Sequence, residues 1–141
     1  GFVEKREMMA GMYAEAIHAT GCPWLAAQKT PAGDRNSYYT FAARFLREDV
    51  PWEVFRKKYV ELGGDGIYAA WTLCYLEDSV ADVQAMLTSI GLEGRLNASS
   101  GLCPTAERIQ KQLMQFTTNQ KNKDEMKKQA ESLYNTIRYF S

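Results

Sequence analysis

Three consecutive segments decide the fold of this chain: Asn36-Ser-Tyr-Tyr-Thr-Phe-Ala-Ala-Arg-Phe-Leu-Arg47, Pro51-Trp-Glu-Val-Phe-Arg-Lys-Lys58 and Gly63-Gly-Asp-Gly-Ile-Tyr-Ala-Ala-Trp71. The first is rich in aromatic and apolar residues and contains neither Gly nor Pro, which predicts a strand over 37–47. The second has apolar side chains at helical spacing, which predicts an amphipathic helix. The glycines of the third predict a tight turn that ends this helix and leads into a second strand over 67–76.

The side chains of the strand over 37–47 alternate between two faces. The opposite face to the aromatic one is mixed rather than polar, since it includes Ala42 and Arg44. We therefore expect this strand to be central in its sheet and covered on both sides. The side chains that share the aromatic face are those of Tyr39, Phe41, Ala43 and Phe45.

Helices are predicted before and after this strand. Apolar residues recur at helical spacing from Phe2 to Thr20, and Gly21 followed by Pro23 ends the pattern. Asp49 is expected to cap the next helix, which carries Pro51 in its first turn, where a missing N–H is tolerated.

Further elements are predicted downstream. Ser79 is expected to cap a third helix, and Cys103-Pro104 to open a fourth. The segment Leu113–Thr118 fits either a continuation of that helix or a short strand. Asn122 followed three residues later by Glu125 resembles a capping box for the last helix.

Length and alternation of elements define the fold class. A short strand over 24–28 adds to the pattern, so helices and strands alternate along the chain. At 141 residues we expect one domain of the α/β or α+β class, with helices packed against one small sheet.

Composition excludes several functional classes. Lys plus Arg and Asp plus Glu are equal at 17 each, so no net positive field favours nucleic acid or an anionic membrane surface. No apolar run approaches the ~20 residues of a membrane span. The three cysteines form no C-x-x-C pair, which is typical of reduced thiols in a cytoplasmic protein.

No self-contained catalytic constellation is visible in the sequence. The only histidine, His18, supplies neither a triad nor a metal shell, although a small complete enzyme using His18 and a cysteine remains a minor alternative. Gly63–Gly66 follows a helix and enters a strand, whereas phosphate-binding loops lead into a helix N-terminus. We therefore predict no catalytic, cofactor-binding or metal-ligating residue within the chain.

The order of these segments resembles the C-terminal part of the DegT/DnrJ/EryC1/StrS family of pyridoxal-phosphate-dependent aminotransferases. The strand, helix and glycine turn quoted above are similar to that part, as is the capped last helix. Leu102-Cys-Pro-Thr-Ala-Glu-Arg-Ile-Gln-Lys-Gln-Leu113 resembles the family's stretch of Pro, a small residue and Ala-Glu leading into a helix. Arg6, Ala10 and Tyr13 match the Arg, Ala and Tyr of the family's interdomain helix, so the resemblance covers nearly the whole chain.

The resemblance implies a specific domain organisation. Residues 1–141 would form the single small C-terminal domain of a fold-type-I aminotransferase, an α+β domain with a mainly antiparallel sheet of about three strands. The chain would begin inside the interdomain helix, which opens at Phe2 without a polar N-cap. Pyridoxal phosphate and its Schiff-base lysine would belong to a large N-terminal domain that is absent here, so this chain alone is expected to hold no cofactor and to be inactive.

Five residues are candidates for substrate binding by this resemblance. Asn36 stands where many relatives have His before the aromatic strand, and Thr72 falls where relatives place a His near the substrate. Tyr68 and Trp71 fit either stacking on a sugar or base, or a role as core aromatics. Arg44 matches a family Arg and fits a substrate phosphate, a carboxylate or a structural ion pair.

The implied function is amino transfer to a nucleotide-linked keto sugar in amino-sugar biosynthesis. The chain would form one wall of the active-site cleft and close over the nucleotide-sugar substrate. Its partners would be its own missing large domain and a second copy, in a homodimer. The alternative is a free-standing, non-catalytic α+β interaction module. Truncation predicts an exposed apolar patch on the first helix, with Phe2, Met8, Met9 and Met12 as its candidates.

Overall fold

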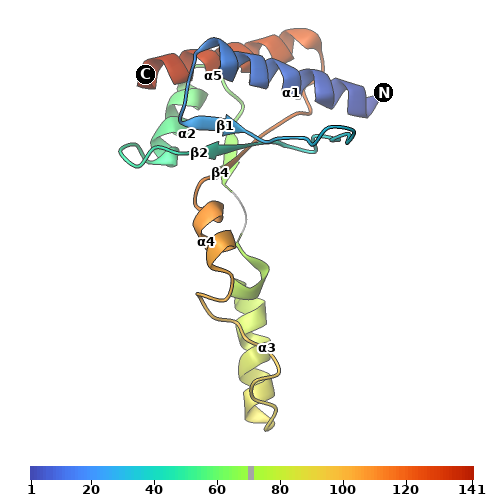
Figure 1. Cartoon of the computed structure of the whole chain (residues 1–141), viewed down its shortest axis with the longest axis vertical. Helices are drawn as coiled ribbons and strands as arrows, with labels where there is room; N and C mark the ends of the chain where they lie inside the picture. The colour runs from blue at the N-terminus through green and yellow to red at the C-terminus, as the bar shows by residue number, and fades with distance from the viewer. Residues whose placement is uncertain (70–71) are drawn as a thin grey trace. The chain divides into compact units, whose positions relative to one another are not determined.

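A computed structural model describes residues 1–69 and 72–141 of the chain (Figure 1). The chain divides into two compact units. The first contains residues 1–69 and 113–141 and includes the sheet, and the second contains residues 70–112. Each unit is described separately below.

The first unit is built on a four-stranded antiparallel sheet with the strand order β1-β2-β4-β3. The strands are β1 (Leu25–Ala27), β2 (Phe41–Phe45), β3 (Ile67–Ala69) and β4 (Leu113–Phe116). The α+β class is confirmed, but the expected sheet of about three strands has four. The segment that the sequence left open, Leu113–Thr118, supplies β4 and pairs with both β2 and β3.

β2 is shorter than the strand predicted over 37–47. Tyr38 has a φ of 46°, and its N–H donates to Asn36 Oδ1 at 2.9 Å. A residue in the left-handed region interrupts extended backbone. The strand therefore begins at Phe41, and Tyr39 lies outside it and is exposed.

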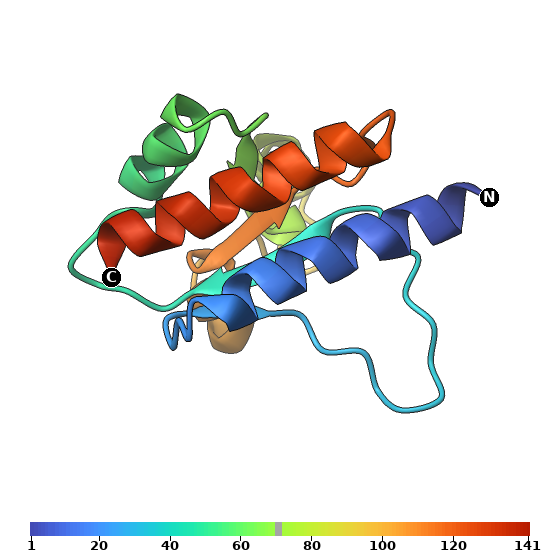
Figure 2. The same ribbon diagram turned by 90° about the horizontal axis from the view of Figure 1, so that it is seen from above.

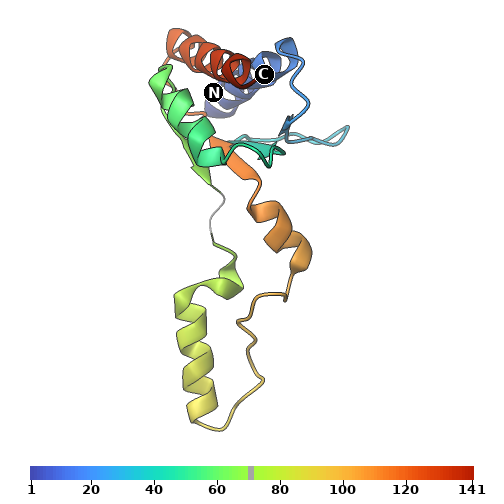
Figure 3. The ribbon, with the colours of Figure 1, turned by 90° about the vertical axis from the view of Figure 1, so that its left-hand side faces the viewer.

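Three helices cover one face of the sheet: α1 (Phe2–Ala19), α2 (Trp52–Glu61) and α5 (Lys123–Phe140) (Figures 2 and 3). α1 and α5 lie side by side over the sheet (Figure 2). Phe41, Ala43 and Phe45 face these helices and are buried, as their alternation predicts. Ala42 and Arg44 on the other side are only half-buried, so the expectation that both faces are covered is wrong.

The core is aromatic at its centre. The Tyr13 ring lies 5.4 Å from Phe41 and 5.3 Å from Phe116, and the Tyr59 ring lies 5.6 Å from Phe116, measured between centroids. Such tilted and edge-on pairs add roughly 0.5–1.5 kcal/mol each beyond the buried area. The core therefore joins α1 and α2 to the sheet through a single set of rings.

Two of the three predicted helix caps are wrong. Asn122 Oδ1 accepts the backbone N–H of Glu125 at 2.9 Å, which confirms the cap of α5. Asp49 does not cap α2, because its carboxylate binds Arg47 and Pro51 occupies the N-cap. α3 (Asp78–Ser89) begins before Ser79, so this serine lies inside the helix.

The glycine turn after α2 is fixed by close packing. Gly63 and Gly66 have φ values of 96° and 129°, as the turn prediction requires. Gly64 has no space for a side chain, because an added Cβ would lie 2.3 Å from the Tyr59 ring. Gln129 Oε1 accepts from the Tyr59 hydroxyl and from Asp65 N–H, both at 2.8 Å, which ties the turn to α5.

The second unit contains a 3-10 turn, η1 (Cys74–Leu76), followed by α3 and α4 (Pro104–Gln110) (Figure 3). η1 lies in the second half of the strand predicted over 67–76, so that strand does not extend this far. The Tyr75 hydroxyl donates to Glu107 Oε1 at 2.7 Å and links η1 to α4. No described side chain of residues 72–112 is buried. α3 therefore exposes several apolar side chains, among them Val83, Met86 and Ile90.

No helix in the described part of the chain is long and apolar enough to cross a membrane.

Candidate functional site

The outer face of the sheet, opposite the three helices, brings two of the predicted site residues together. Strand register places Arg44 between Ala26 of β1 and Leu113 of β4. Tyr68 of β3 lies opposite Gln115, which in turn pairs with Ala42 of β2. Since alternate residues of a strand point to the same face, these two rows form one surface. We refer to the surface made by these two rows as the outer face.

Tyr68 is a surface residue of the outer face. Its side chain is 55% exposed, so the interpretation as a core aromatic is wrong. One strand, β4, separates it from the strand of Arg44. With strands about 4.8 Å apart and an offset of two residues along β4, the two backbone positions lie about 12 Å apart on the sheet. This spacing lets both side chains contact one extended ligand.

Arg44 borders a depression of about 410 Å³ in the outer face. The depression is lined by residues 26–29, residues 42–44 and Leu113. Gln28 Oε1 accepts the N–H of Ala42 at 2.7 Å, which fixes one side chain of the wall to the neighbouring strand. The charged residues of the lining are Arg44 and Lys29, both cationic.

Lys29 is a site residue that the sequence did not indicate. It follows β1 in a loop, where its sequence context predicts only a solvated charge. The pairing of β1 with β2 brings the segment after Ala27 beside Ala42, and Lys29 thereby reaches the depression. No local sequence pattern encodes this register.

Asn36 has a structural role in the loop before β2. Its Oδ1 holds the N–H of Tyr38, an Asx turn that accompanies the positive φ at that residue. Arg6 secures the same loop from α1, since its Nη1 donates to Tyr39 O at 2.5 Å and to Thr118 Oγ1 at 2.9 Å. The structure thus places Asn36 in the loop, away from the two rows of the outer face.

The last two candidates fall in the other part of the chain. Trp71 lies outside the described residues. Thr72 is exposed and belongs to the unit of residues 70–112, within which alone it is described.

His18 and Cys22 line a separate depression of about 440 Å³ at the end of α1. Burial raises the pKa of the Cys22 thiol, which keeps it protonated near neutral pH. A protonated thiol is a poor nucleophile, so this pair does not resemble an activated Cys–His dyad. Among the described residues, no group of three His, Cys, Asp or Glu side chains fits a metal ion.

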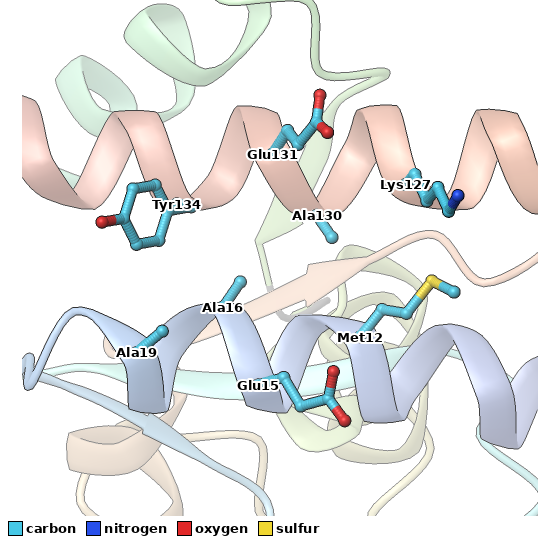
Figure 4. A pocket seen from close by; sticks show the side chains of 8 residues that line it. All are labelled: Met12, Glu15, Ala16, Ala19, Lys127, Ala130, Glu131 and Tyr134. Carbon is cyan, nitrogen blue, oxygen red and sulfur yellow. The ribbon is translucent and has the colours of Figure 1, made fainter.

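A second groove, of about 410 Å³, runs between α1 and α5 on the side away from the sheet (Figure 4). Met12, Ala16 and Ala130 line it between the two helices, and charged side chains, such as Glu15 and Lys127, border it (Figure 4). It contains no buried titratable group, so it offers a surface for contact rather than for chemistry.

The predicted apolar patch on the first helix is correct only in part. Phe2 is 86% exposed and Met8 47% exposed. Met12 is half-buried in the groove between α1 and α5. Met9 is fully buried in the core beneath α1, so it does not belong to any exposed patch.

The lysines do not fit a site that anchors pyridoxal phosphate. A Schiff-base lysine is buried and has a lowered pKa. None of the lysines in this chain is buried. The least exposed, Lys58, is hydrogen-bonded to Glu61, and this contact raises its pKa.

No protein-family model matches the chain, and no curated protein matches it either.

Proposed function

We propose that this chain is the small C-terminal domain of a pyridoxal-phosphate-dependent aminotransferase of the DegT/DnrJ/EryC1/StrS type. Its substrate would be a nucleotide-linked keto sugar, and its product an amino sugar. The observation that supports this best is the one-sided sheet. Three helices cover one face, while the outer face carries Arg44 and Tyr68, as a domain that forms one wall of a cleft requires.

In this proposal the chain positions the substrate rather than reacting with it. Tyr68 stacks on a sugar or base, and Arg44 contacts an anionic group of the same ligand. The cofactor, which supplies the electron sink for amino transfer, is held by the large domain. The outer face closes the cleft from the other side and excludes water. The assembly is proposed to be a homodimer, with the large domain as the direct partner of this chain.

A kinetic comparison in the full-length parent tests the role of Tyr68. Tyr68→Ala should raise KM for the sugar nucleotide about 3–10-fold, since one aromatic contact is worth roughly 0.5–1.5 kcal/mol. Tyr139→Ala is the matched control, because Tyr139 is similarly exposed but lies on α5. Equal effects of the two substitutions would contradict a substrate contact at Tyr68.

The isolated chain provides a second test. Mixed with pyridoxal phosphate, it should give no stable shifted absorption band that a single lysine substitution abolishes, because none of its lysines is buried. Such a band, or amino transfer by these residues alone, would contradict the proposal.

The alternative, a free-standing interaction module, is favoured by one observation. The second unit exposes apolar side chains on α3 without a buried core of its own in the described residues. The intact mass of the natural protein separates the two functions. An upstream large domain containing a buried lysine supports the aminotransferase.

A further inference from the structure

α3 carries an apolar stripe that its own unit leaves uncovered. Val83, Met86 and Ile90 are three and four residues apart, so their side chains lie on one side of the helix. These side chains are between 45% and 61% exposed. We refer to the three residues as the α3 stripe. It runs along about two turns, with the spacing by which one helix packs against another.

The second unit packs against a different side of α3. Gln84 Oε1 accepts the N–H of Ala98, in the segment that runs back along the helix (Figure 3). Val80 and Leu87 are half-buried, and they share this side with Gln84 because they lie four residues before it and three residues after it. The α3 stripe lies beside these contacts, so it remains available to a partner.

The charge around the α3 stripe has one sign. Residues 72–94 contain no lysine, arginine or histidine, and their acidic residues are Glu77, Asp78, Asp82 and Glu93. Asp78 and Asp82 are exposed and four residues apart, so they form a row of carboxylates on the helix. Asp82 is also four residues before Met86, which places this row along one border of the stripe. Neither aspartate forms an ion pair with a described residue.

These charges select the kind of partner. A second copy of α3 packed antiparallel would bring the aspartates near the carbonyl end of the other helix, where negative charge is unfavourable. Packed parallel, the two rows of carboxylates would lie at the same level and repel each other. A helix with lysine or arginine beside its own apolar stripe meets opposite charge instead.

We propose that α3 is a docking surface for a cationic amphipathic helix of another protein. The α3 stripe supplies the apolar contacts, and Asp78 and Asp82 supply the contacts to the cations. A contact of about two turns is small, so the complex is expected to be weak and reversible.

Binding of a model helix to the 141-residue chain tests this surface. The probe is a synthetic peptide made of two repeats of Leu-Lys-Lys-Leu-Leu-Lys-Leu, which presents leucines on one side of a helix and lysines on the other. At low ionic strength, ¹H–¹⁵N NMR should show saturable shifts of the α3 amides. A peptide of the same composition in scrambled order, and one with Glu in place of every Lys, should each bind at least about 10-fold more weakly.

Matched variants test the apolar contact. Met86→Gln should weaken binding of the lysine peptide about 3–10-fold, because a polar amide replaces the central side chain of the α3 stripe. Met8→Gln is the control, since it makes the same change at a similarly exposed methionine of α1 and should leave the affinity unchanged.

A second pair of variants tests the charges. Asp82→Asn should weaken binding about 2–5-fold at low salt and make the affinity less dependent on ionic strength, as expected for an exposed ion pair. Asp124→Asn changes the net charge equally at an exposed position of α5, and it should change neither quantity.

Four results would overturn the proposal. They are the absence of saturable α3 shifts at millimolar peptide, equal binding of the scrambled or the Glu peptide, equal weakening by Met8→Gln, and concentration-dependent shifts of the α3 amides without peptide. The last would identify a second copy as the occupant. If Met86→Gln unfolds α3, the Asp82→Asn variant and the Glu peptide still decide the outcome.

The docking surface goes beyond amino transfer and does not depend on it. A parent without amino transfer would contradict the proposed function and leave a measured α3 surface standing. An active parent whose α3 does not bind the lysine peptide would contradict the docking surface alone.

Discussion

Tyr59 shows how one residue fixes several elements of the first unit. Its ring packs on Phe116 of the sheet, its hydroxyl donates to Gln129 of α5 and lies 3.4 Å from the Tyr13 hydroxyl of α1. Burial raises the pKa of the Tyr59 phenol, so it remains a neutral donor. Gly64 lies directly against the same ring. The turn, α1, α5 and β4 therefore depend on the position of one side chain.

Gly64→Ala should lower the free energy of unfolding by roughly 1–3 kcal/mol. The new Cβ would meet the Tyr59 ring at 2.3 Å, and this buried ring has no space to move. Urea denaturation measures the change. Gly11→Ala is the control, because nothing lies within 4 Å of its Cβ position in α1, and it should stabilise the protein by up to about 1 kcal/mol. Equal effects at both positions would contradict the close packing.

Arg35 and Glu7 provide a pH-dependent contact between the loop and α1. Arg35 Nε and Nη2 donate to the two carboxylate oxygens of Glu7 at 2.6 and 2.9 Å, and this contact lowers the pKa of Glu7. The stabilisation is present above the unfolded pKa of about 4.3 and is lost as the pH falls through the lower folded pKa. Arg35→Gln should raise the NMR titration midpoint of Glu7, whereas Lys5→Gln should leave it nearly unchanged. An unmoved midpoint in Arg35→Gln would exclude the pair in solution.

At the scale of single elements, α5 is the helix that the sequence specifies best. Asn122 caps it, and Glu125 Oε2 accepts the N–H of Lys121 at 3.0 Å, so two donors near its start are satisfied locally. Its apolar stripe then packs on α1 and the sheet through residues such as Leu133 and Ile137. The capping residues and the apolar stripe therefore specify the same helix.

Asn122→Ala should reduce the free energy of unfolding by about 1 kcal/mol, because the Glu125 N–H loses its acceptor. Asn135→Ala makes the same change at an exposed position within α5 and should be neutral or slightly stabilising. Thermal or urea unfolding of both variants compares them directly. A loss of stability in Asn135→Ala alone would show that the cap does not act as described.

Local signals predicted some elements, and long-range contacts decided the others. Asn122 with Glu125 is a signal contained within four residues, and it is correct. Ser79 is likewise followed three residues later by an acidic residue, Asp82. α3 nevertheless begins before Ser79, so the same kind of signal failed there. β4 is too short for periodicity to identify, because its four residues become a strand only between β2 and β3.

The candidate site could be predicted only in part for the same reason. Because side chains alternate between the two faces of a strand, the sequence predicts that Arg44 lies on the face opposite Phe41 and Phe45. The structure confirms this placement. That Tyr68 shares its surface follows from the strand order, which no local pattern contains. The position of Lys29 beside the depression depends in addition on the register of β1 on β2.

At the scale of the whole molecule, the two units differ in how many side chains they bury. The first unit contains every buried residue of the described chain, and residues 72–112 contain none. Helices without buried contacts derive little stability from packing. The resistance of this protein to unfolding should therefore be unevenly distributed.

Hydrogen exchange measures that difference. Amides of α3 should exchange at least about 100-fold faster than those of α5, because opening α3 breaks no buried contact among the described residues. Mass spectrometry of peptides from the two helices provides the comparison within one sample. Equal protection of α3 and α5 would mean that the second unit is stabilised by contacts beyond those described.

β1 is an edge strand of the sheet, and this position has a consequence for the behaviour of the protein at high protein concentration. Unpaired strand borders recruit other chains through their free amide and carbonyl groups. Here the strand is only three residues long, Pro23 lies just before it without an amide hydrogen, and the charge of Lys29 follows it. β1 therefore offers few unpaired backbone groups to which a strand of another molecule could bind. This protects the protein against ordered aggregation through this edge.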